Sequence, residues 1–122
     1  MIEAATATLE EVLTDFRDRF NENARVKKLI VGWNRDILVE PLDAETAYTM
    51  VIANLEMTSV SPGINEGHDG QVHMQADEDI LKRIFTGEYN PATALIDGNM
   101  AVFSEERDKV KLEAIAMVIW GL

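Results

Sequence analysis

The chain has 122 residues, 47% of them apolar and 27% charged, and a net charge of −11, from which we expect one soluble, cytoplasmic domain spanning residues 1–122. Its lack of cysteine excludes disulfides and thiolate catalysis. No apolar run approaches the roughly 20 residues of a membrane-spanning helix, and the first residues have no features of a secretory signal. No lysine or arginine occurs between Asp36 and Leu81, and a surface of this sign repels phosphates and anionic lipid head groups, so we expect neither nucleic-acid binding nor stable membrane insertion.

The first segment is predicted to be an amphipathic helix that ends at residues 21–23. Its apolar residues recur every three or four positions, and Thr8 with Glu11 forms a candidate capping box. Two short apolar runs follow, Lys28 to Trp33 and Ile37 to Leu42, and the turn-forming residues between them predict a β-hairpin. Residues 46–57 then read as one long strand with apolar residues on both faces.

The second half predicts short elements with clear ends. Residues 59–70 read as a loop and residues 71–76 as a half-buried strand, followed by a helix with Asp77 as its N-cap. Asn90-Pro91 begins a short helix that runs through Ile96, residues 99–103 form the last strand, and Ser104 caps the final helix. Strands followed by helices favour an α+β fold, with an antiparallel sheet and helices against one face.

Catalytic and metal-binding patterns are weak. Glu66, His68, Asp69 and His73 could gather around a divalent metal, but their spacing matches no strong signature. The serines have no convincing base nearby, and the glycines of residues 63–70 lack the lysine and flanking elements of a phosphate-binding loop. We therefore expect no enzyme activity, no metal and no cofactor.

The sequence instead has a surplus of apolar residues. Five methionines besides Met1 are spread along the chain, and methionine adapts its shape to variable apolar partners, although it also fills ordinary cores. Residues 114–120 are all apolar, so they cover every side of a helix. A sheet with a neighbouring helix, a dimer partner or a lipid must cover them.

The C-terminal half resembles the sterol carrier protein type-two family, the nonspecific lipid-transfer proteins. The resemblance is carried by Val72-His73-Met74-Gln75-Ala76-Asp77-Glu78-Asp79-Ile80-Leu81 and by the helix stops and starts Thr86-Gly87, Asn90-Pro91 and Gly98 at their fixed separations. It is clear from Gln71 to Trp120. The chain departs from the family pattern at Phe103-Ser104-Glu105, and its end, Trp120-Gly121-Leu122, does not support peroxisomal import.

The resemblance implies a five-stranded antiparallel sheet, an apolar tunnel between sheet and helices, and a lipid cargo such as a sterol, a fatty acid or a fatty acyl thioester. Fold alone does not settle function. We therefore predict binding and transfer of a hydrophobic ligand. The candidate lining residues are Met50, Ile52, Ile84, Phe85, Leu95, Ile96, Met100, Val102, Ile115, Val118 and Ile119. Lys82 and Arg83 are the candidate cations for an anionic head group.

The alternative is a non-catalytic dimerisation or interaction module on the same fold. In that case side chains fill the tunnel, and the final helix forms a homodimer interface with Trp33, Met117 and Trp120 as anchors. An internal cavity of several hundred Å³ would favour the lipid carrier. A solid core with a large symmetric interface would favour the module.

Overall fold

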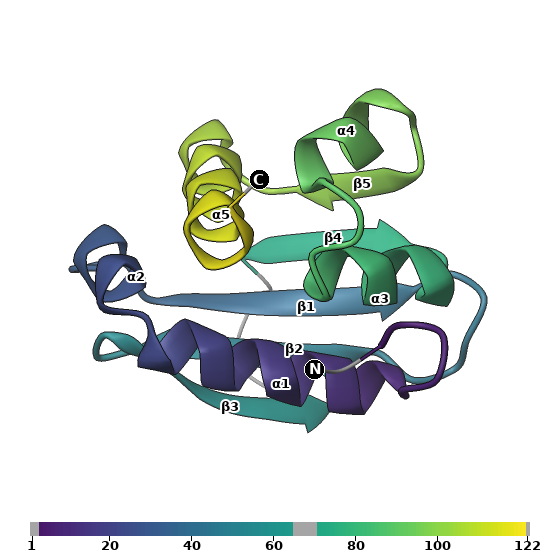
Figure 1. Cartoon of the computed structure of the whole chain (residues 1–122), viewed down its shortest axis with the longest axis horizontal. Coiled ribbons are helices and arrows are strands. Elements are labelled where there is room, and N and C mark those ends of the chain that lie inside the picture. Colours follow the sequence, from purple (N-terminus) through teal and green to yellow (C-terminus); the bar gives the residue numbers. More distant parts are fainter. Residues whose placement is uncertain (1–2, 65–70, 122) are drawn as a thin grey trace.

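A computed structural model describes residues 3–64 and 71–121, and in it one sheet is covered on one face by helices (Figure 1). The elements, in chain order, are α1 (Leu9–Glu22), α2 (Ala24–Leu29), β1 (Arg35–Pro41), β2 (Tyr48–Ala53), β3 (Glu56–Pro62), β4 (Val72–Ala76), α3 (Glu78–Phe85), α4 (Pro91–Ile96), β5 (Met100–Phe103) and α5 (Glu106–Trp120). This confirms the predicted α+β class. Among the described residues, no helix is long and apolar enough to cross a bilayer.

The sheet has the strand order β3-β2-β1-β4-β5 and is mixed, which corrects the prediction of a purely antiparallel sheet. The central pair, β1 and β4, is parallel, with Ile37 opposite Val72 and Val39 opposite Met74. All other pairs are antiparallel. Because β3 and β4 point the same way, the connection between Pro62 and Val72 is a crossover and not a hairpin.

The predicted strand at residues 28–33 is wrong, because this segment completes the short helix α2 and a turn. The side chain of Asn23 accepts hydrogen bonds from the backbone nitrogens of Arg25 and Val26, which begins the helix. Val26 and Ile30 are both buried, and their spacing of four residues is helical. The hairpin predicted from this segment therefore does not form, and β1 pairs with β2 instead.

The predicted long strand at residues 46–57 is also wrong, because these residues form β2, a turn and the start of β3. The predicted loop at residues 59–70 is wrong over residues 59–62, which continue β3 and pair with β2. Asn54 and Leu55 form the two-residue turn, and both have positive φ, 54° and 69°. Tight hairpins require this left-handed conformation, which Asn-Gly provides most easily. Because leucine replaces the usual glycine at the second turn position, the sequence does not match the Asn-Gly pattern by which such turns are predicted.

The predicted helix starts are mostly confirmed. Thr8 and Glu11 form the capping box of α1, and the side chain of Asn90 accepts from two backbone nitrogens at the start of α4. Asp77 is the N-cap of α3, but the carboxylate that accepts from the first backbone nitrogen of the helix belongs to Asp43. Ser104 does not cap α5; Glu105 is the N-cap, and the Ser104 hydroxyl donates to the Glu105 carbonyl.

The core lies between the inner face of the sheet and the helices. Alternate strand residues such as Ile37 and Val39 are buried there, against apolar residues of α1 and α3. Figure 1 shows α1 along β2 and β3, with α3 beside it and α5 standing between α2 and α4. The opposite face is more polar, and on it Glu40 accepts a hydrogen bond from Gln75 at 2.6 Å. The apolar core therefore lies on the helix side of the sheet.

Candidate ligand-binding cavity

An apolar cavity of about 60 Å³ lies between the inner face of the sheet and helices α1, α3, α4 and α5. All five strands or their ends contribute to its walls, and α5 covers it. It is lined by Phe16, Phe20, Ile37, Met50, Ile52, Met57, Met74, Ile84, Phe85, Pro91, Leu95, Met100, Val102, Lys109, Leu112, Glu113, Ile115, Ala116 and Trp120. Its volume is well below the several hundred Å³ that we expected of an open carrier site.

Most of the predicted lining residues lie at this cavity. They come from β2, α3, α4, β5 and α5, and they are Met50, Ile52, Ile84, Phe85, Leu95, Met100, Val102 and Ile115. Ile96 is 85% exposed, because α4 buries Ala94 and turns its last residue away from the sheet. Val118 and Ile119 are partly buried against the core but are not in the lining.

One wall of the cavity, which α1 provides, is absent from the predicted lining. Phe16 and Phe20 belong to the apolar stripe of the amphipathic helix predicted at the start of the chain, and both line the cavity. The Phe16 ring meets the Phe85 ring edge to face, with centroids 5.0 Å apart. Helical periodicity identifies such a stripe but does not distinguish a packed core from a cavity wall.

Methionine is the side chain that recurs around the cavity. Met50, Met57, Met74 and Met100 all line it, each from a different strand. These four are buried, whereas Met117 is 58% exposed on α5. Because unbranched methionine side chains change shape at low cost, a wall that contains four of them can adapt to the outline of a guest.

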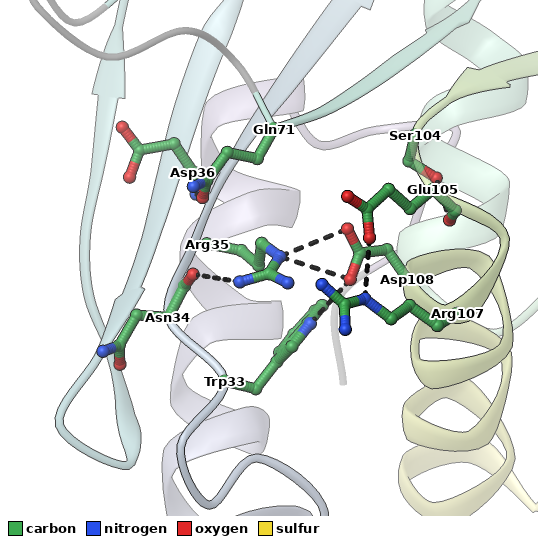
Figure 2. A network of polar contacts seen from close by, with 9 residues as sticks. All are labelled: Trp33, Asn34, Arg35, Asp36, Gln71, Ser104, Glu105, Arg107 and Asp108. Atoms are coloured by element: carbon green, nitrogen blue, oxygen red, sulfur yellow. Dashed lines mark hydrogen bonds and ion pairs between the residues drawn. The ribbon is translucent and has the colours of Figure 1, made fainter.

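The N-terminal end of α5 is held by a buried polar network (Figure 2). Asp108 is 2% exposed, and its Oδ1 accepts a 2.8 Å hydrogen bond from the Trp33 indole nitrogen. Nε of Arg35 lies 3.2 Å from both carboxylate oxygens, while Nη1 donates to the Asn34 carbonyl. A buried carboxylate is tolerable only when it is paired and hydrogen-bonded in this way. The network therefore ties α5 to the start of β1.

The C-terminal end of α5 is held by the ring of Trp120. A Cβ atom at Gly87 would lie 2.7 Å from this ring, so the ring packs directly on the glycine backbone. The Arg19 guanidinium lies 4.9 Å from the ring centroid. Among the described residues the Trp120 indole nitrogen is buried and has no hydrogen-bond partner. Contacts at both ends thus position α5 over the cavity.

Lys109 and Glu113 are the charged residues of the cavity lining within the described part of the chain. Nζ of Lys109 lies 4.0 Å from a Glu106 carboxylate oxygen. The structure does not bring Lys82 and Arg83 to the cavity. The Lys82 ammonium donates to the Ala7 carbonyl, and the Arg83 guanidinium lies over the Tyr89 ring.

Trp33 and Trp120, the two tryptophans predicted to anchor a homodimer, instead make contacts within their own chain. Trp33 is 7% exposed and bonded to Asp108, and Trp120 packs on Gly87. Met117 is exposed, so part of the apolar helix end is uncovered in the single chain. A homodimer through this helix stays a prediction.

Within residues 3–64 and 71–121, no three histidine or acidic side chains are grouped so that they could hold a metal ion. Three members of the candidate metal group, Glu66, His68 and Asp69, lie outside the described residues. The fourth, His73, is on the outer sheet face, with Nε2 3.1 Å from a Glu40 carboxylate oxygen. It is therefore remote from the cavity, on the other side of the sheet.

Neither a family model nor a curated protein sequence matches this chain. Solved structures match it at the level of fold. A crystal structure of sterol carrier protein 2 has a TM-score of 0.65 at 10% identity, covering 93% of this chain and 95% of that chain. Palmitated SCP2L2 from Aedes aegypti has a TM-score of 0.61 at 10% identity, with 90% and 95% covered. The chain therefore has the fold of sterol carrier protein 2 domains.

The same fold also occurs as a domain of a larger enzyme. The stereoselective inverting sec-alkylsulfatase Pisa1 from Pseudomonas sp. matches 75% of this chain with a TM-score of 0.57 and 16% identity, but only 14% of the enzyme chain is covered. A domain of this fold is thus found both as a separate carrier protein and within an enzyme.

Proposed function

We propose that this protein binds a hydrophobic ligand, such as a sterol, a fatty acid or a fatty acyl thioester, in the cavity beneath α5 and transfers it. The observation that carries the proposal is the lining, which is apolar apart from Lys109 and Glu113 and contains four methionines. The fold supports it, because solved structures of this fold include a sterol carrier protein and a palmitated protein.

The energetics favour such a ligand. Burial of about a dozen methylene groups at ~0.8 kcal/mol each gives roughly 10 kcal/mol. Immobilising the ligand removes about half of this, and the remaining ~5 kcal/mol corresponds to a dissociation constant of a few tenths of a millimolar. The cavity of about 60 Å³ must widen to admit the ligand, since pockets for such molecules span roughly 300–1,000 Å³. Rotation of methionine side chains and outward movement of α5 provide this space.

Mass spectrometry of solvent extracts from gently purified protein, together with displacement of a fluorescent fatty acid, tests the proposal. The variant Ala116→Phe places a ring into the cavity from α5 and should weaken probe binding by about ten-fold or more. Met117→Phe places the same ring at the next, exposed position and serves as the control. An empty extract and no displacement would refute the proposal and favour the interaction module, which sedimentation would show as a stable dimer.

A further inference from the structure

We propose that Lys109 and Glu113 make the cavity select neutral lipids that end in a hydroxyl group over fatty-acid anions. This inference rests on the proposed function and concerns the head group of the ligand. It replaces the prediction that Lys82 and Arg83 receive an anionic head, since neither residue lines the cavity.

The position of a ligand head group in the cavity is limited by where polar partners lie. A polar group buried among apolar side chains loses hydrogen bonds to water and gains none in return. Lys109 and Glu113 are four residues apart on α5, so their side chains project from the same face of the helix. Within the described lining they alone bring charged groups, and their neighbours in it are apolar. A ligand that fills the cavity therefore places its head beside these two residues.

The charge around Lys109 and Glu113 is negative overall. The Lys109 ammonium already has the Glu106 carboxylate 4.0 Å away, and its side chain is 31% exposed. The carboxylates of Glu106 and Glu113 together outnumber the single ammonium of Lys109, and the whole chain has a net charge of −11. A fatty-acid carboxylate that approaches Lys109 therefore meets repulsion as well as attraction.

Lys109 and Glu113 also differ in the hydrogen bonds that they can make. An ammonium only donates and a carboxylate only accepts. A hydroxyl group does both, so it can accept from Lys109 and donate to Glu113 at the same time. A carboxylate head can accept from Lys109 but cannot donate to Glu113, which leaves the two carboxylates opposed. Donor, acceptor and charge at this end of the cavity thus all favour the neutral hydroxyl.

Binding of dodecan-1-ol and dodecanoate, measured by displacement of a pyrene-labelled fatty alcohol at pH 8 and low salt, tests the inference. The two ligands have the same chain length and differ only in the head group. We expect the wild-type chain to bind the alcohol at least about three-fold more tightly, the factor typical of an exposed charge interaction. Tighter binding of dodecanoate by the wild-type chain would overturn the inference.

Two variants assign the selection to these residues. Glu113→Gln should strengthen dodecanoate binding by about three-fold and weaken binding of the alcohol, because an amide oxygen is a weaker acceptor than a carboxylate. Lys109→Gln should weaken dodecanoate binding further. Glu22→Gln makes the same charge change at an exposed residue of α1 that does not line the cavity, and should leave the selectivity unchanged. An equal effect of Glu113→Gln and Glu22→Gln would overturn the inference while leaving lipid binding intact. Failure of every chain to bind either ligand would instead refute the proposed function itself.

Discussion

The Trp33 indole nitrogen and the Asp108 carboxylate, 75 residues apart in the sequence, form a buried hydrogen bond of 2.8 Å. It joins the residues before β1 to the first turn of α5 (Figure 2). The helix that covers the cavity is therefore positioned by a polar group inside the molecule as well as by apolar packing.

Trp33→Phe should lower the free energy of unfolding by about 1.5–3 kcal/mol, because it leaves a buried carboxylate without one of its donors. Trp120→Phe is the matched control. It removes a buried indole nitrogen that has no partner among the described residues, so it costs only the packing of the larger ring and should lower stability less than Trp33→Phe. Urea unfolding of both variants measures the difference, and equal losses would contradict the assignment.

Asp108→Asn should lower stability by about 2–3 kcal/mol, because it leaves the Arg35 guanidinium without its counter-charge. This is less than a fully buried pair would lose, since the Arg35 side chain is 18% exposed. Asp18→Asn, at a pair with Arg17 in which the carboxylate is 60% exposed, should have almost no effect. Thermal and urea unfolding would refute the prediction if the two variants behaved alike.

Gly87→Ala should destabilise the chain more than Gly98→Ala. Both glycines have positive φ, 83° and 75°, so either alanine incurs a backbone cost of about 1 kcal/mol. Only at Gly87 does the new Cβ also meet the Trp120 ring, at 2.7 Å, whereas nothing lies within 4 Å at Gly98. Adding Trp120→Ala to each variant should remove the difference, as a double-mutant cycle would measure. A difference that persists would place its origin elsewhere.

The hydrogen bond from the Thr8 backbone nitrogen, and then the Thr8 side chain, lower the pKa of Glu11 below its ordinary value of 4.5. A carboxyl group with a lower pKa in the folded chain stabilises the fold above its unfolded pKa. This contribution is lost as the pH falls through the folded pKa. NMR titration should find a lower pKa for Glu11 in the folded chain than in urea. The stability of Glu11→Gln should fall less on acidification than that of the wild-type chain.

Features that depend on neighbours within a few residues could be predicted from the sequence. The capping box of Thr8 and Glu11 and the Asn90-Pro91 start of α4 are complete within four residues, so their patterns predict the helix starts correctly. The alternation in residues 72–76 likewise predicts β4. Most of the predicted lining residues also lie at the cavity, because they are apolar residues on the inner faces of the strands and helices.

Tertiary structure alone decided the features that join distant segments. The parallel pairing of β1 with β4 depends on the path of the whole chain, and no local pattern states a direction. The turn at Asn54 and Leu55 forms because the strands on either side pair with each other. Nothing in the sequence distinguishes Asp108 from the other acidic residues, because its partners Trp33 and Arg35 lie more than 70 residues away and meet it only in the folded chain. Lys109 and Glu113 reach the cavity for the same reason, since the orientation of α5 is set by contacts at its two ends that lie far apart in the sequence.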